Sequence, residues 1–389
     1  MSHPEFSLET QCAALVVELG LGRADDVVAV EQLTGGVASD IAKVVLKDRV
    51  ICVKFALSKL KVAEDWRAPV HRNAAEYAWL SAASAIAPEA ALQLFGWSNV
   101  RNGFAMEYLD GPNQFLWKSA LMQGPVPVGV AAKVAGLVVR IHAASARPAF
   151  DRTAFANRDD FDALRLDPYL RFTAACHPDV AGRIMRVLDG LFASQTVLVH
   201  GDVSPKNIIM RGEVPVILDA ECATMGDASF DPAFCLNHLV LKAFYRPDAR
   251  GALLDEAADF WDSYRVHIDW EDPAKLESRV AILVPMLMLA RVDGKSPVEY
   301  LTKAQAEQVR TVALDLIHKP PKTISALLKS IPTILRGSTG DAISDDHRGD
   351  TQPQDLGLSR QSDGRGRRDP RRRTRGTGHR ACRGIPRDA

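Results

Sequence analysis

Two short apolar runs that frame a group of polar residues constrain this chain more than any other feature of its sequence. The first run delivers Asp202 into a loop, and Asn207 follows five residues later. The second run ends at Asp219, with Glu221 two residues beyond it. Phosphoryl transfer needs one carboxylate to take the proton of an attacking hydroxyl, and it needs oxygen ligands for Mg²⁺. The sequence therefore predicts a phosphoryl-transfer centre, with Asp202 as the base and Asn207, Asp219 and Glu221 as metal ligands.

The spacing of these residues is that of a known catalytic loop. Asp-x-x-x-x-Asn, with a metal-binding Asp after the next strand, is the order found in protein kinases. Here His200-Gly-Asp replaces His-Arg-Asp, and Asp219-Ala-Glu replaces Asp-Phe-Gly. With these replacements the chain resembles the aminoglycoside phosphotransferase and choline kinase superfamily of small-molecule kinases, over about residues 25–335. Such polar residues also satisfy ordinary turns, but five of them in this order between two apolar runs favour the catalytic interpretation.

The resemblance implies an α+β fold of the bilobal, protein-kinase-like type, and the residue pattern agrees with it. Residues 25–108 predict a small, mostly antiparallel β-lobe that binds the nucleotide and carries one helix. Residues 109–336 predict a larger, mostly helical lobe for catalysis and acceptor binding. Residues 1–24 have apolar side chains at helical spacing and predict a helical extension. The expected strands are 27–30, 41–46, 50–54, 91–96 and 103–108, and the expected helices include 73–83 and 128–143.

Lys54 ends the apolar strand Val50-Ile-Cys-Val-Lys. A charge at that place is costly unless it meets an anion. In the kinase-like scheme this lysine contacts the ATP phosphates and pairs with an acid on the following helix, for which Glu76 is the best candidate. The alternative is a lysine that snorkels to the surface at a strand end, and the catalytic loop downstream favours the nucleotide role.

Two further segments complete the expected nucleotide site. Gly35, Gly36 and Ser39 lie in a turn between strands, where glycine lets backbone amides approach a triphosphate. The turn has no Gly-x-Gly-x-x-Gly pattern, so an ordinary hairpin stays open, while the resemblance to the superfamily's Gly-Gly-x-Ser type of loop favours binding. By the same resemblance the backbone at Glu107 and Tyr108, where the two lobes join, meets the adenine, and the alternative is a plain linker.

The resemblance also assigns supporting roles. Asp231 matches an aspartate that braces the catalytic loop, and His200 is expected to support the same loop. His142, in Ile141-His-Ala, matches a buried structural histidine that is not a base.

Two segments are similar to methylthioribose kinase, a member of the same superfamily. They are residues 55–67 and residues 290–297, and the second makes Arg291 and Asp293 candidates for substrate binding. A solvated helix end is the alternative for both residues. Asn207 departs from the loop expected of that relative, which argues against a methylthioribose assignment.

Composition limits the classes to which the chain can belong. The apolar content of 47% and charged content of 25% are those of an ordinary soluble globular protein. A net charge of zero argues against nucleic-acid or membrane binding by the folded part. Six cysteines without a CxxC pair suit a reducing cytosol. We see no signal-peptide pattern and no apolar run long enough for a bilayer, and we expect a cytoplasmic protein whose oligomeric state the sequence leaves open.

Residues 337–389 differ from the rest of the chain. They contain no Lys, Glu or aromatic residue but twelve Arg and eight Asp, so they cannot bury a core and are expected to be disordered. An Arg-rich tail can bind nucleic acid, and we favour the alternative of a non-functional extension. Without the tail the chain carries about four more acidic than basic residues, which further weakens a nucleic-acid role.

Together these observations predict an enzyme that uses ATP and Mg²⁺ to O-phosphorylate a small hydroxylated molecule. The alternatives are a sugar kinase similar to methylthioribose kinase, and a nucleotide-binding protein of the same fold without kinase activity. A clustered negative field favours a neutral or cationic acceptor. The alternative is that Lys206, Arg291 and the basic segment 59–72 hold a sugar or an anionic group. The acids that crowd the catalytic side of the sequence are Asp202, Glu213, Asp219, Glu221, Asp227 and Asp231.

Overall fold

The computed structural model describes residues 7–33, 39–57, 70 and 72–340. The chain divides into two units, residues 1–332 and residues 333–389. The strands of the described residues are β1 Val27–Leu33, β2 Ser39–Leu46, β3 Val50–Ala56, β4 Leu94–Ser98, β5 Gly103–Glu107, β6 Gln114–Leu116, β7 Val197–Val199, β8 Ile208–Arg211, β9 Val214–Ile217 and β10 Thr224–Gly226. The helices are α1 Leu8–Glu18, α2 Arg72–Ile86, α3 Trp117–Met122, α4 Val130–Ser145, α5 Arg158–Phe161, the π-helical segment η4 Asp162–Arg171, α6 Phe172–Cys176, α7 Pro178–Ala193, α8 Phe230–Tyr245, α9 Arg250–Arg265, α10 Pro273–Asp293, α11 Lys303–His318 and α12 Ile324–Gly340.

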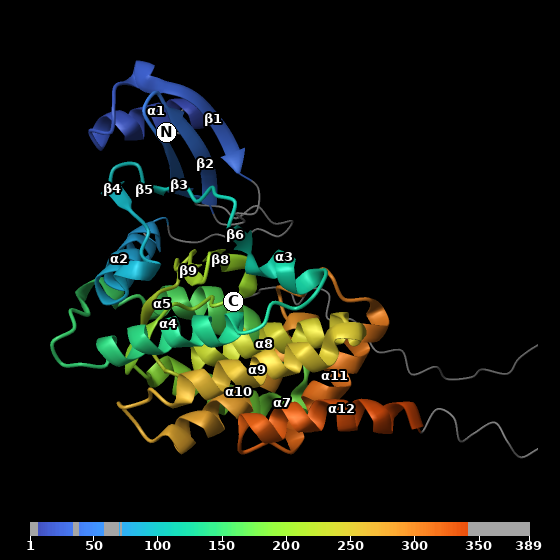
Figure 1. The fold of residues 1–389 in the computed structure, drawn as a ribbon. Helices are drawn as coiled ribbons and strands as arrows, with labels where there is room; N and C mark the ends of the chain where they lie inside the picture. Colours follow the sequence, from blue (N-terminus) through green and yellow to red (C-terminus); the bar gives the residue numbers. More distant parts are fainter. Residues whose placement is uncertain (1–6, 34–38, 58–69, 71, 341–389) are drawn as a thin grey trace, which may run out of the picture. The chain divides into compact units, whose positions relative to one another are not determined.

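An antiparallel sheet of five strands, in the order β1-β2-β3-β5-β4, forms the N-terminal lobe (residues 7–107). Its strands are rich in valine and isoleucine, which suit a pleated, half-buried surface. Helix α1 covers one face of this sheet (Figure 1). The helix and sheet share one apolar cluster, which includes Cys12, Leu15, Val16, Ala42, Val44, Ile51 and Val53. Residues 8–18 are therefore part of the lobe's core and not a separate extension.

Helix α2 follows the sheet in the chain and carries the first polar residue of the site. Alanine, the best helix former, occupies six of its fifteen positions. Its buried side contains Ala75, Glu76, Trp79 and Leu80, at the spacing that places residues on one face. A buried glutamate among apolar residues needs a partner, because an unpaired charge in that environment is costly.

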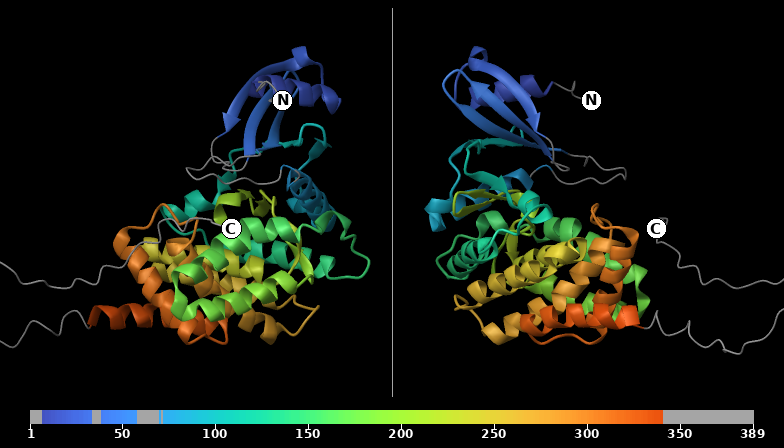
Figure 2. Two further views of the ribbon diagram at one scale, coloured as in Figure 1. Left: turned by 180° about the vertical axis from the view of Figure 1, so that it is seen from behind. Right: turned by 45° about the vertical axis from the view of Figure 1, so that its right-hand side comes forward.

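Helix α8 is the centre of the C-terminal lobe (residues 108–332). Every residue from Phe230 to Phe244 is buried, as expected for a helix that is apolar all round. Helices α9 and α10 pack against it, and α4 packs against α9 (Figures 1 and 2). This helical core holds the short strands that carry the polar loop.

Two small antiparallel pairings fix the loop at both ends. Strand β7 pairs with β10, and β8 lies between β6 and β9 in a three-stranded sheet. The polar loop leaves β7 at His200 and enters β8 at Ile208, and Asp219 comes two residues after β9 ends. The strands thus bring Asp202 and Asp219 to the same side of the lobe.

The fold class predicted from the sequence is confirmed. An antiparallel sheet region is followed by a larger helical region, in a mixed α+β arrangement. Among the described residues, no helix combines the length and the apolar character needed to cross a membrane.

Candidate active site

Asp231 holds the start of the catalytic loop through its backbone. Its Oδ2 accepts the N–H of His200 at 2.7 Å, and its Oδ1 accepts the N–H of Gly201 at 2.9 Å. Gly201 has φ +82°, and a Cβ there would lie 3.0 Å from the Cβ of Cys222. Only glycine adopts this conformation without strain. The His-Gly-Asp order is therefore set by a backbone bend that turns Asp202 away from strand β7.

His200 joins the two chain segments of the site. Its Nδ1 accepts the N–H of Asp202 at 3.1 Å, and its Nε2 lies 3.1 Å from the carbonyl oxygen of Leu218. With Nδ1 accepting, the proton of a neutral ring is on Nε2. Burial lowers the pKa of His200, although nearby carboxylates oppose this effect. The histidine therefore supports the loop as a neutral ring.

Asp202 is a buried carboxylate held by two cations. Its Oδ2 lies 3.1 Å from Nη2 of Arg165 and 3.2 Å from Nζ of Lys206. Burial alone raises the pKa of a carboxyl group, but Lys206 and Arg165 outweigh it and hold the pKa of Asp202 well below its usual range. Its Oδ1 is buried and has no hydrogen-bond partner among the described residues. One oxygen is thus fixed, and the other is available to a hydroxyl group.

Asn207 and Asp219 supply oxygens of the kind that Mg²⁺ prefers. Nδ2 of Asn207 donates to the carbonyl of Asp202 at 3.1 Å, which leaves its carboxamide oxygen without a partner in the described part of the chain. Asp219 has φ +70°, a conformation that residues other than glycine rarely adopt, and such strain is typical of functional sites. This donor set fits Mg²⁺, which is usually bound by one or two carboxylates together with phosphate oxygens and water. Among the described residues, no three His, Cys, Asp or Glu side chains lie together in a group that could hold a metal ion.

Lys54 connects the two lobes. Its Nζ lies 2.7 Å from Oε2 of Glu76, on α2, and it also donates to Oδ1 of Asp219. Burial alone lowers the pKa of a lysine, but Asp219 and Glu76 outweigh it and raise the pKa of Lys54 above its usual value. The ammonium group is therefore permanently charged beside the carboxylate of Asp219.

Glu221, a predicted metal ligand, forms an ion pair with an arginine. Its Oε2 accepts from Nε of Arg72 at 3.0 Å, and both side chains are buried. Arg72 also donates to the carbonyl of Leu57 at 2.8 Å. Glu221 thus ties the segment after Asp219 to the start of α2.

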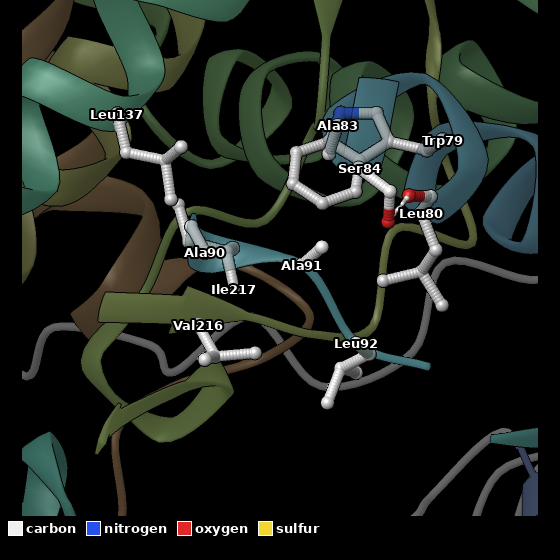
Figure 3. Close-up of a pocket in the computed structure, with 10 residues that line it drawn as sticks. All are labelled: Trp79, Leu80, Ala83, Ser84, Ala90, Ala91, Leu92, Leu137, Val216 and Ile217. Carbon is white, nitrogen blue, oxygen red and sulfur yellow. Dashed lines mark hydrogen bonds between the residues drawn. The ribbon is translucent and has the colours of Figure 1, made fainter. Parts of the chain in front are cut away.

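Helix α2 is also fixed to the catalytic segment by apolar packing. The ring of Trp79 meets that of His200 edge to face, with centroids 4.7 Å apart. Figure 3 shows Trp79, Leu80 and Ala83 of α2 beside Val216 and Ile217 of β9. The space between them is about 10 Å³, room for one water at most. These residues therefore pack α2 against β9, and the space between them is too small for a ligand.

The other expected nucleotide contacts are placed in part. Gly35 and Gly36 lie outside the described residues. Ser39 begins β2, and its Oγ is buried without a hydrogen-bond partner in the described segments. The Glu107 carboxylate lies 3.2 Å from Nη1 of Arg211 on β8, so this side chain ties the junction of the lobes together.

Tyr108 follows β5 at this junction. Nζ of Lys43 lies 4.8 Å from the centre of its ring. The cation of β2 therefore covers the face of the tyrosine.

The two remaining groups of predicted residues separate in the structure. His142 is buried, with Nδ1 2.6 Å from the Tyr264 hydroxyl and Nε2 3.2 Å from Oδ2 of Asp231, so it lies directly behind the catalytic loop. Asp293 is bound at 2.6–2.8 Å by Arg310 and His177, within the helical core. Arg291 instead contacts the hydroxyl of Tyr169 at 3.2 Å.

Sequence reasoning singled out Lys206 but missed Arg165, the second cation at Asp202. Arg165 lies on η4, with no motif around it, and it meets Asp202 only through the fold. His238 and Lys242, on the buried helix α8, also have no motif around them. A charged residue in an otherwise apolar helix was the available signal, because such residues are seldom buried without a purpose.

A family model decides the class of the protein. Residues 29–276 match the model of the phosphotransferase enzyme family, which is more than half of the chain. The chain belongs to this family. It is a phosphotransferase, as the sequence predicts.

Solved structures of similar fold include three small-molecule kinases or members of their families. A choline/ethanolamine kinase family protein from Mesorhizobium loti is 16% identical, with 84% of this chain and 98% of that chain covered and a TM-score of 0.49. A choline kinase from Streptococcus pneumoniae is 14% identical, with 86% and 92% covered and a TM-score of 0.42. An ethanolamine kinase from Plasmodium vivax is 13% identical, with 87% and 89% covered and a TM-score of 0.45. No curated protein sequence matches the chain.

Proposed function

We propose that this phosphotransferase uses ATP and Mg²⁺ to phosphorylate a hydroxyl group of a small molecule. The observation that carries the proposal is the contact of Lys54 with Glu76 and Asp219, because it joins a strand of one lobe to the segment after the catalytic loop in the other. A lysine fixed in this way is suited to the phosphates of a nucleotide. Ser39, Glu107 and Tyr108 border the nucleotide in this scheme, and the ligands of Mg²⁺ are Asn207 and Asp219.

Each residue has a defined task in the reaction. When bound, Mg²⁺ neutralises charge on the phosphates that are transferred and released. Asp202 accepts a hydrogen bond from the acceptor hydroxyl with its free Oδ1 and takes the proton as the new bond forms. Because its pKa is low, Asp202 is a weak base, and its main contribution is to orient the hydroxyl. Asp231 keeps the loop in place, and Glu221 acts through Arg72 as a brace.

The test is titration calorimetry of the full chain with MgATP, together with a coupled assay for ADP formation over a panel of hydroxyl compounds. Asp219→Asn removes one charge from the proposed metal site. Glu213→Gln is the matched control, since Glu213 is an exposed acid in the turn between β8 and β9. We expect MgATP affinity to fall at least about tenfold in Asp219→Asn, from the loss of one charge-assisted contact, and to stay unchanged in Glu213→Gln. Equal affinity in all three proteins removes Asp219 from the site, and MgATP binding without turnover on any acceptor favours the nucleotide-binding alternative.

A further inference from the structure

A group of cations on the C-terminal lobe lies beside the proposed catalytic base. We call Lys206, His238, Lys242 and Arg291 the basic cluster. Lys206 touches Oδ2 of Asp202 at 3.2 Å. His238 lies within electrostatic range of Lys206, Lys242, Arg291 and Asp202, and burial holds its pKa well below the usual value, so it belongs to the cluster as a neutral ring. The cluster therefore borders the place where the acceptor hydroxyl meets Asp202.

Aromatic side chains connect the members of the cluster. Nη1 of Arg291 lies 3.2 Å from the hydroxyl of Tyr169, which is four residues after Arg165 on η4. The ring of Tyr169 lies 5.5 Å from that of Phe234, and Phe234 lies 5.2 Å from His238. These contacts run from the segment that binds Asp202 to the buried side of α8.

Lys242 extends the cluster one turn further along α8. Its Nζ lies 5.6 Å from the centre of the Tyr300 ring. His238 and Lys242 thus lie one turn apart on the same face of α8.

The acids near this face are already bound. Asp167 is held by Lys295 and Arg171, at 2.7 and 3.0 Å. Glu299 is held by Lys118 at 2.6 Å. Asp293 is held by Arg310 and His177, as described above. The nearby carboxylates therefore leave the charges of Lys242 and Arg291 unbalanced.

The acids that the sequence places on the catalytic side are also occupied. Glu221 is bound by Arg72, Glu213 by Lys133 and Asp227 by Arg279. Asp231 accepts two backbone N–H groups and contacts His142. The expectation of an acidic acceptor face counted these acids without the partners that the fold gives them.

Lys242 and its neighbours hold polar groups that lack partners. The side chain of Lys242 is 1% exposed, and among the described residues its Nζ has one hydrogen bond, to the carbonyl of His238 at 3.4 Å. Nε of Arg291 and the hydroxyl of Tyr300 are buried and have no hydrogen-bond partner in the part of the chain that the structure describes. Burying such groups without partners is costly, so their retention indicates a ligand that satisfies them.

We propose that the acceptor carries an anionic group, a carboxylate or a phosphate, in addition to its hydroxyl, and that Lys242, Arg291 and Tyr300 bind this group while Asp202 receives the hydroxyl. This proposal rests on the proposed function. A cationic acceptor at the same place meets like charges from Arg291 and Lys242 in a poorly solvated environment, which is unfavourable. An anion receives charge-assisted hydrogen bonds there, and these are the stronger kind.

The experiment has a binding part and a turnover part. In the binding part, millimolar sulfate is the anion probe, and its effect on the melting temperature is measured at constant ionic strength. The proteins are the wild type, Lys242→Met, Tyr300→Phe, Lys54→Met and the control Lys133→Met, whose side chain pairs with Glu213 on another face. In the turnover part, glycerate, glycerol 3-phosphate, glycerol and choline are compared as acceptors.

Sulfate is expected to raise the melting temperature of the wild type, Lys54→Met and Lys133→Met, and to have a weaker effect or none on Lys242→Met and Tyr300→Phe. Loss of the effect in Lys54→Met alone assigns the anion to the nucleotide site and overturns the proposal. So does an equal effect in Lys242→Met, or no effect in the wild type. The sulfate measurement needs no turnover. A protein that fails to bind MgATP would disprove the proposed function, and the calorimetric titration detects that failure separately.

In the turnover part, the anionic acceptors are expected to be preferred, with KM raised about 10- to 100-fold in Lys242→Met by the loss of one charge-assisted contact. Glycerate and glycerol 3-phosphate distinguish a carboxylate from a phosphate. A preference for choline or glycerol that Lys242→Met leaves unchanged overturns the proposal.

Discussion

The guanidinium of Arg165 and the carboxylate of Asp202 form a buried ion pair, with Nη2 and Oδ2 3.1 Å apart and side chains 8% and 6% exposed. The same guanidinium donates from Nε to the carbonyl of Gly201. One residue thus fixes both the carboxylate of the proposed base and the backbone before it. Because η4 also carries Tyr169, the segment links the catalytic loop to the basic cluster.

Arg165→Leu is expected to lower turnover most strongly at acidic pH. The pKa of Asp202 lies below its usual range, so its ion pair stabilises the fold above the unfolded value of about 3.9 and loses this effect as the pH falls. Without Arg165 that pKa rises, and the acidic limb of the pH–rate profile moves upward. Removing one partner of a buried pair costs about 3–5 kcal/mol of unfolding free energy. Arg165→Lys keeps a charge and is expected to lose less turnover at acidic pH and less free energy of unfolding. If the acidic limb of the pH–rate profile does not move in Arg165→Leu, the role given to the ion pair is wrong.

Asp202→Asn is expected to keep the affinity for MgATP and to lose turnover by about 10²–10⁴-fold, the usual contribution of a positioned base. The amide keeps the shape of the side chain but accepts no proton. Calorimetry and single-turnover kinetics separate the two effects. Glu213→Gln serves as a control, because Glu213 is an exposed acid in the turn between β8 and β9. Full turnover in Asp202→Asn assigns the base elsewhere.

The part of the site that the sequence predicts is the part that is local in the chain. Asp202 and Asn207 are held by one loop, and Asp219 follows one hairpin later, so their order alone carries information. The kinase-like scheme pairs Lys54, on an expected strand, with Glu76, on an expected helix, and in the structure the two side chains lie 2.7 Å apart. The bounds of β3 and α2 lie within two or three residues of the predicted ones for the same reason.

The part that the sequence does not predict depends on pairs that are distant in the chain. Arg165 meets Asp202 across 37 residues, and Arg72 meets Glu221 across 149 residues. Neither pair leaves a periodic signal. Counting acids along the sequence also does not show which of them are bound by cations, as Glu221 is by Arg72.

Gly201→Ala is expected to lower both stability and activity. Its φ of +82° costs a non-glycine residue about 1–2 kcal/mol, and the new Cβ lies 3.0 Å from that of Cys222. The distorted loop then moves Asp202 from its position. Gly182→Ala is the matched control, since Gly182 lies inside α7 with no heavy atom near the added Cβ, and it is expected to gain up to about 1 kcal/mol. Chemical denaturation and the ADP assay measure both effects, and two variants of equal stability refute the constraint at Gly201.

Lys242→Met is expected to stabilise the protein at neutral pH while it weakens acceptor binding. Burial, reinforced by Lys118 and Arg291 and opposed by Cys235 and Glu299, lowers the pKa of Lys242 from 10.5 to about 7. Between these two values the unfolded chain binds a proton that the folded chain does not, so unfolding free energy rises with pH in this interval. Below pH 7 the penalty of the buried charge is complete, and above about 10.5 it disappears.

Methionine removes this penalty without a large change in volume, so the gain from Lys242→Met is expected to be about 1–4 kcal/mol near pH 7 and to decline toward pH 10.5. Denaturant unfolding at a series of pH values measures it, with Lys133→Met as the control that shows no such trend. Functional sites commonly contain residues that lower the stability of the fold. A buried Lys242 that lowers the free energy of unfolding is therefore explained by a ligand that it binds. Destabilisation by Lys242→Met at every pH contradicts the view of Lys242 as an unbalanced charge that an anionic acceptor completes.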